Sequence, residues 1–97
     1  MTPPFTRHAE AQFLAALARI HAANPAAAVA FRHRAERALE RLGPFPRSGR
    51  RLLEFPNRGL REVIVPPYRF FYRMIGREPV ILAVWHSAQQ PARPKRG

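Results

Sequence analysis

The chain has 97 residues, with 17 Lys or Arg, 6 Asp or Glu and a formal net charge of +11. This length suits one domain, because a second would be too small to bury a hydrophobic core. The sequence has no cysteine, which excludes disulfides, a thiol nucleophile and cysteine-ligated metal centres. No apolar run approaches the roughly 20 residues that span a bilayer, and no signal peptide is evident. We therefore expect a small, soluble, cytoplasmic protein.

The positive charge favours a polyanionic partner. Almost all of the cations are arginines, and a charge this high on so small a body creates a strong positive field. Nucleic acid, an acidic protein segment and an anionic membrane are the partner classes that such a field attracts. Because a GC-rich genome also produces arginine by drift, the alternative is that part of this charge only keeps the surface soluble.

The first half of the chain is predicted to form two helices. Thr6 suits the N-cap of the first, and apolar residues recur at helical spacing at positions 13, 17 and 20. Asn24-Pro25 is a restart signal, since Asn suits an N-cap and Pro is tolerated in a first helical turn. The second helix keeps the same spacing and ends near Gly43-Pro44. The two helices therefore form a hairpin.

The second half changes to strand patterning. A loop rich in Pro, Gly and Arg over residues 44–59 is expected, with a short strand around Arg51–Phe55. Pro3–Thr6 is a candidate for a short edge strand. Tight antiparallel turns at Pro66-Pro67 and around Gly76 separate three apolar runs. These runs are Leu60–Val65, Tyr68–Ile75 and Val80–His86.

The order of these elements predicts an α+β fold. An N-terminal helical hairpin packs on a small antiparallel sheet, in the order β-α-α-β-β-β. The run Tyr68–Ile75 carries aromatic residues on both faces, which indicates a central strand with helices on one side. We expect residues 1–88 to form a single domain and residues 89–97 to form a basic, flexible tail.

A basic patch is predicted on the sheet face away from the helices. Strand alternation places Arg69 and Arg73 together on that face, near Arg61 on the preceding strand and His86 at the end of the last. With aromatic walls, such a patch suits phosphate groups and unstacked bases. The alternative is an ordinary solvated face whose arginine stems cover apolar surface.

Catalytic candidates are few. His86 is the histidine nearest this patch, and a histidine can act as a general acid or base. The alternative is that it caps a turn or meets a partner. Glu54 in the loop is the candidate carboxylate base. The other histidines lie in the helical half without metal-ligand spacing, so we expect no metal site and no cofactor.

Several segments, taken in chain order, resemble the RelE/ParE superfamily of type II toxin–antitoxin toxins. The resemblance covers nearly the whole chain, although none of its motifs is specific alone. The matching segments are residues 24–28, 39–42, 45–46, 49–50, 60–73 and 80–86. The fold that this resemblance implies is the β-α-α-β-β-β arrangement described above.

The resemblance implies two alternative activities. The turn at 66–69 and the ending at 84–91 look more like the ParE-like branch, which implies a growth-arresting toxin that inhibits DNA gyrase. Such a toxin is neutralised by a cognate acidic, ParD-like antitoxin in a hetero-oligomer, without a membrane partner. The site residues are then Arg61, Arg69, Arg73 and His86, as candidates for binding the target or phosphate.

The second branch is RelE-like and implies a ribosome-dependent endoribonuclease that cleaves mRNA. Arg69 matches the strand arginine that contacts the scissile phosphate, and His86 falls near the catalytic histidine of some relatives. Arg73 and Glu54 complete the catalytic candidates of this alternative. The chain lacks the C-terminal tyrosine and the lysine-rich helix of many such nucleases. The sequence therefore favours a gyrase inhibitor that is not an enzyme.

Overall fold

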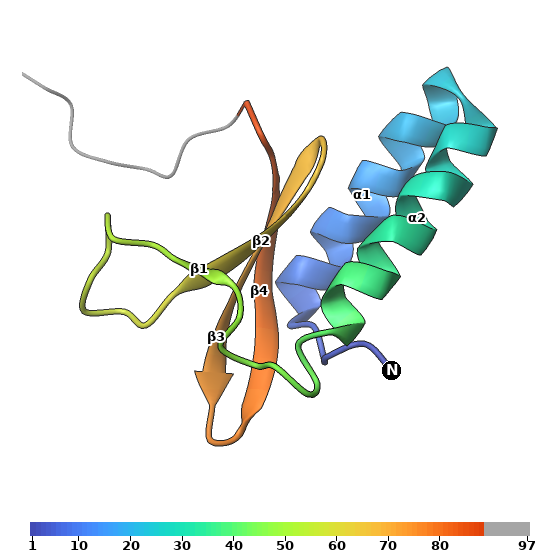
Figure 1. The fold of residues 1–97 in the computed structure, drawn as a ribbon. Coiled ribbons are helices and arrows are strands. Elements are labelled where there is room, and N and C mark those ends of the chain that lie inside the picture. Colours follow the sequence, from blue (N-terminus) through green and yellow to red (C-terminus); the bar gives the residue numbers. More distant parts are fainter. Residues whose placement is uncertain (89–97) are drawn as a thin grey trace, which may run out of the picture.

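The computed structural model describes residues 1–88 and contains two helices packed on one four-stranded sheet. The elements are α1 (Arg7–Ala23), α2 (Pro25–Glu40), β1 (Arg50–Arg51), β2 (Arg61–Val65), β3 (Tyr68–Ile75) and β4 (Glu78–His86). Both helices lie side by side against the same face of the sheet (Figure 1). The predicted α+β class and helical hairpin are thus confirmed. The predicted basic tail at 89–97 lies outside the described residues.

Two polar caps define the helical hairpin. The hydroxyl of Thr6 accepts a hydrogen bond from the N–H of Ala9 at 3.0 Å, and Oδ1 of Asn24 accepts one from Ala27 at 3.1 Å. Both satisfy N–H groups that the first helical turn leaves without a partner. Asn24 alone links the two helices, in the extended backbone that a residue before proline prefers. The predicted caps are therefore confirmed.

The sheet is antiparallel throughout, in the order β1-β2-β3-β4. β3 lies between β2 and β4, as its aromatic pattern predicts, with Phe70 opposite Val63 on one side and Val84 on the other. A register shift between Phe71 and Tyr72 interrupts the β3–β4 pairing. The predicted strands are confirmed, although β4 begins earlier than expected, at Glu78.

Two short elements differ from the prediction. The short strand expected around Arg51–Phe55 is present only as β1, which consists of Arg50–Arg51, so its predicted extent is wrong. The chain turns after it: the N–H of Leu52 donates to Leu60 and that of Phe55 to Leu52. The edge strand expected at Pro3–Thr6 is reduced to one parallel bridge between Phe5 and Ile81. Prolines have no N–H to donate, which limits pairing at that position.

The hydrophobic core lies between the helices and the sheet. Phe31 of α2 is almost fully buried, with its ring centroid 5.5 Å from that of Tyr68 and 6.4 Å from that of Phe70. These β3 side chains point toward the helices, which leaves the opposite sheet face uncovered by them. The loop of residues 52–60 lies on that opposite side (Figure 1). Within residues 1–88, neither helix is long and apolar enough to cross a membrane.

Candidate functional site

The sheet face away from the helices, hereafter the open face, carries an apolar groove. Strand alternation directs Phe71 and Arg73 of β3 to this face. Loop 52–60 supplies the facing wall, and the hollow has a volume of about 510 Å³. Except for Arg58 and Arg73, the lining is apolar. It consists of Leu52, Phe55, Arg58, Leu60, Phe71, Arg73, Leu82, Ala83 and Trp85.

A buried carboxylate on the open face holds two arginines. Glu62 is only 2% exposed. Its Oε2 pairs with Arg50, whose Nε donates at 2.6 Å, and its Oε1 accepts from Nε of Arg69 at 2.7 Å. The Arg69 guanidinium also lies 4.9 Å from the ring centroid of Phe71. Two cations therefore compensate one buried charge, which would otherwise be costly. Arg69 is accordingly part of a structural ion pair.

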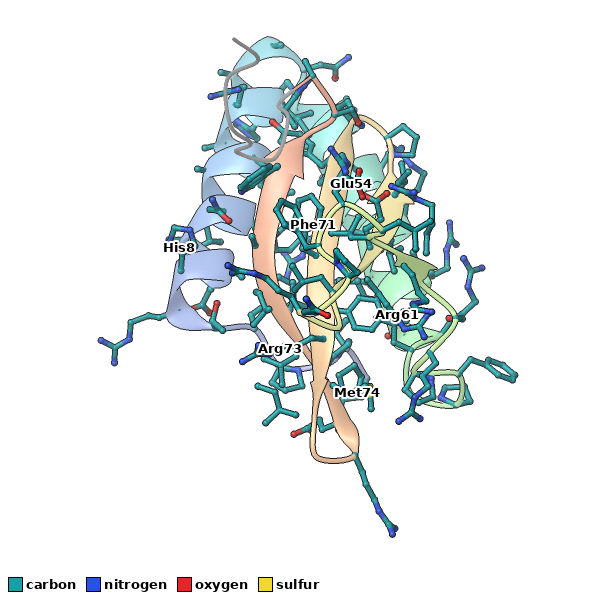
Figure 2. The ribbon with its side chains drawn as sticks, turned by 90° about the vertical axis from the view of Figure 1, so that its left-hand side faces the viewer. His8, Glu54, Arg61, Phe71, Arg73 and Met74 are labelled. Atoms are coloured by element: carbon teal, nitrogen blue, oxygen red, sulfur yellow. The ribbon has the colours of Figure 1, made fainter. Side chains whose placement is uncertain are left out.

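Five arginines surround a second, polar hollow beside the apolar groove, which we name the arginine basin. Its volume is about 290 Å³. Arg58, Leu60 and Arg73 line both hollows, so the two adjoin one another. In Figure 2 the labelled side chains of Arg61, Arg73 and Met74 lie toward the lower end of the sheet. The basin is lined by Arg47, Arg51, Arg58, Gly59, Leu60, Arg61, Arg73 and Met74.

The basin brings like charges together without acidic compensation. Within residues 1–88, no carboxylate forms an ion pair with any of its five arginines. Arg51 and Arg61 stand directly opposite one another across the β1–β2 pair, an arrangement that is normally destabilising. Nη1 of Arg61 donates to the carbonyl of Gly49 at 2.9 Å. The basin therefore concentrates positive charge at one end of the sheet.

A buried tyrosine fixes the loop that carries Arg47. The hydroxyl of Tyr72 donates to the carbonyl of Pro46 and accepts from the N–H of Gly49, both at 2.8 Å. Burial raises the pKa of Tyr72, and the Gly49 hydrogen bond and the nearby charge of Arg61 lower it by less. The hydroxyl is thus neutral at physiological pH. It ties residues 46–49 to the sheet, next to the basin.

The predicted site residues do not converge on one point. Arg61 and Arg73 both line the basin, whereas Arg69 pairs with Glu62. His86 stands opposite Tyr68, whose ring packs under the helices, and the two ring centroids are 5.2 Å apart. Directly paired residues share a face, so His86 lies on the helix side of the sheet.

Distance separates these residues further. His86 pairs with Tyr68, and Arg73 lies five residue steps further along β3, which at about 3.4 Å per step amounts to about 17 Å. Glu54 is exposed and lies toward the upper end of the sheet in Figure 2, whereas Arg73 lies below Phe71. His86, Arg73 and Glu54 therefore occupy separate places on the molecule.

Sequence reasoning missed four residues of the arginine basin and of the buried ion pair. Arg47 and Arg58 come from irregular segments, and Arg51 comes from the two-residue strand β1. Hydrophobic periodicity does not predict the path of such short or irregular segments. Glu62 was predictable: the short Pro66-Pro67 turn fixes the β2–β3 register, and alternation then places Glu62 on the face of Arg69. Within the described part of the chain, no group of three or more His or Glu side chains is arranged to hold a metal ion.

Comparisons with known proteins agree with this architecture. A family model described as the ParE toxin of the type II toxin–antitoxin system, parDE, matches residues 4–91. A chain of the solved structure entitled "Chromosomal ParDE TA system from P. aeruginosa" has the same fold, with a TM-score of 0.62 at 22% identity. The match covers 89% of this chain and 95% of that one. No curated protein sequence matches. Because the family model spans most of its length, the chain belongs to the ParE toxin family of type II toxin–antitoxin systems.

Proposed function

We propose that this toxin inhibits DNA gyrase and that a cognate antitoxin silences it. The family match over residues 4–91 is the observation that carries the proposal. The resemblance of the turn at 66–69 and of the ending at 84–91 to the ParE-like branch points to the same target. The toxin acts by binding, so it needs a surface that fits gyrase rather than a set of catalytic groups.

The geometry of the open face supports a binding protein over a nuclease. Cleavage of a phosphodiester needs an acid and a base within hydrogen-bond reach of one phosphate. His86 and Arg73 lie on opposite faces of the sheet, about 17 Å apart along β3. Arg69 is held by the buried carboxylate of Glu62. These positions favour gyrase inhibition over mRNA cleavage.

The proposed antitoxin is ParD-like and acidic. The solved structure with the same fold is described as a ParDE toxin–antitoxin system, which supports a hetero-oligomer here. A partly disordered acidic segment gains order when it folds along the toxin's helices and sheet. The net charge of +11 speeds the encounter with such a segment through long-range attraction.

Inducing the toxin in cells without its antitoxin tests the target. DNA and protein synthesis are pulse-labelled together after induction. Gyrase inhibition predicts that DNA synthesis stops first, with a DNA-damage response, and that purified toxin traps gyrase in its cleavage complex with DNA. Earlier arrest of protein synthesis would contradict the proposal.

A double variant distinguishes gyrase inhibition from the nuclease alternative. Replacing Arg69 by Ala is unsuitable, because the buried Glu62 would lose one of its two cationic partners and the folded state would be destabilised. His86→Gln combined with Glu54→Gln removes the candidate proton-transfer groups and leaves that ion pair intact. We expect the double variant to remain toxic. A loss of toxicity in a variant with an unchanged circular dichroism spectrum would instead support the nuclease.

A further inference from the structure

We propose that the arginine basin binds the phosphate backbone of duplex DNA, so that the toxin itself contacts DNA. This inference goes beyond gyrase inhibition and does not depend on it. The observation that carries it is the convergence of five arginines, without ion-pair partners in residues 1–88, on one hollow of about 290 Å³.

The cost of building the basin indicates that it has a ligand. Arg51 and Arg61 face each other directly across two strands, and Arg73 and Arg58 approach the same hollow from β3 and from the loop. Like charges this close repel one another. A bound polyanion removes this repulsion, and a planar guanidinium can give two parallel hydrogen bonds to one phosphate.

The density of charge favours phosphate over the carboxylates of an acidic peptide. Duplex DNA presents one negative charge per roughly 1.7 Å of its axis, so several phosphates lie within reach of one basin. Among residues 1–88, the basin is lined, apart from its arginines, only by Gly59, Leu60 and Met74. It offers little apolar surface for the side chains of a peptide, which would prefer the neighbouring apolar groove.

None of the described residues that line the basin is aromatic, which favours a duplex over a single strand. Proteins that bind single strands stack the bases on aromatic side chains. The rings of the open face lie in the apolar groove instead, where Phe71 and Trp85 pack edge to face with centroids 5.2 Å apart. Arg69 lies over the Phe71 ring. The basin therefore suits contacts to the backbone alone.

Binding of a short fluorescent DNA duplex of mixed sequence, measured by anisotropy over a range of NaCl concentrations, tests the proposal without gyrase. The variant Arg58→Gln/Arg73→Gln removes two exposed basin arginines. Its matched control, Arg19→Gln/Arg37→Gln, removes two exposed arginines from the helices and lowers the net charge equally. Thermal unfolding and circular dichroism verify that both variants fold.

We expect the basin variant to lose about tenfold or more in affinity at low salt and about two units of the salt slope, since each phosphate contact contributes about 0.9. The control should lose little of either. Equal losses in both variants would overturn the proposal in favour of diffuse attraction, and so would unchanged binding by the basin variant.

Two competitors test the nature of the ligand. Polyglutamate of matched charge should displace the duplex poorly, and competition as strong as that of unlabelled duplex would assign the basin to an acidic protein segment. A single-stranded oligonucleotide should bind more weakly and leave the fluorescence of Trp85, the one tryptophan, unchanged. If the single strand bound more tightly than the duplex and quenched Trp85, the proposed duplex ligand would be wrong. The result would instead indicate a single strand whose bases stack in the apolar groove.

Discussion

Gly49 occupies a position where a larger residue does not fit. A Cβ atom there would lie 2.5 Å from Cε1 and 2.6 Å from the hydroxyl of Tyr72. We expect Gly49→Ala to lower the free energy of unfolding by about 1–3 kcal/mol, because the Tyr72 ring must move and the hydrogen bonds of its hydroxyl to Pro46 and Gly49 weaken. Chemical denaturation measures the change. Gly43→Ala is the control, since its Cβ would lie 3.4 Å from the nearest atom, the carbonyl of Glu40. Equal stability of the two variants would contradict the prediction.

Tyr72 holds the loop at 46–49 through its hydroxyl. Tyr72→Phe leaves the Pro46 carbonyl and the Gly49 N–H without this partner. We expect a loss of about 1–3 kcal/mol in the free energy of unfolding near neutral pH, the usual cost of orphaned buried groups. The thermal unfolding midpoint, measured beside that of the wild type, detects it. An unchanged midpoint would mean that water replaces the hydroxyl at no cost.

The same tyrosine makes stability depend on pH at the alkaline end. Burial raises the pKa of Tyr72 in the folded state above its value of about 10 in the unfolded chain. The contribution of this group to stability is therefore complete below pH of about 10 and is lost as the pH rises through the folded pKa. Between neutral pH and that range, the wild type should lose more stability than Tyr72→Phe. Parallel pH profiles would be inconsistent with this reasoning.

At the residue scale, the sequence predicted the site in part. Alternation placed Arg73 on the open face, and chain order placed Arg61 near it. His86 was expected beside them, but the strand register sets it opposite Tyr68. Register depends on turn geometry and bulges, which a periodic pattern does not encode. The chemical types of the site residues were therefore easier to predict than which of these residues come together in space.

At the element scale, long periodic segments were predictable and the segment at 44–60 was not. Helix spacing and caps gave α1 and α2, since their amphipathic faces and N-caps are local signals. The path of residues 52–60 depends instead on tertiary contacts, such as the hydrogen bond from Leu52 to Leu60. The basin arginines from this region were missed for that reason.

The linker of the helical hairpin provides a prediction at this scale. Asn24 ends α1 and caps α2 through its side chain. Asn24→Ala should lower the free energy of unfolding by about 1 kcal/mol, the usual cost of losing such a cap. This corresponds to a fall of about 4–8 °C in Tm for a chain of this size. Asn24→Ser, which retains a cap, should recover most of the loss.

Asn57→Ala is the matched control for Asn24. Asn57 is exposed in the loop of residues 52–60 and caps no helix. Its replacement should leave Tm nearly unchanged. If both substitutions lowered Tm equally, the loss at Asn24 would not come from capping.

At the scale of the whole molecule, charge opposes folding. A net charge of +11 on 97 residues disfavours the compact state through self-repulsion. The arginine basin concentrates this repulsion at one end of the sheet, where no carboxylate in residues 1–88 pairs with its arginines. Sites that bind strongly charged ligands often reduce stability in this way. The same charges that attract a polyanion should therefore weaken the isolated toxin.

Salt dependence of stability tests this trade-off. Added NaCl screens repulsion among exposed charges, so Tm should rise with ionic strength. Arg51→Gln removes the like-charge pair with Arg61 and should raise the free energy of unfolding at low salt by about 0.2–1 kcal/mol. This gain should shrink at high salt, because screening has already weakened the pair. Arg19→Gln, which lies on α1 outside the basin, should gain less. A lower stability of Arg51→Gln at low salt would show that Arg51 stabilises the fold and that the basin carries no electrostatic strain.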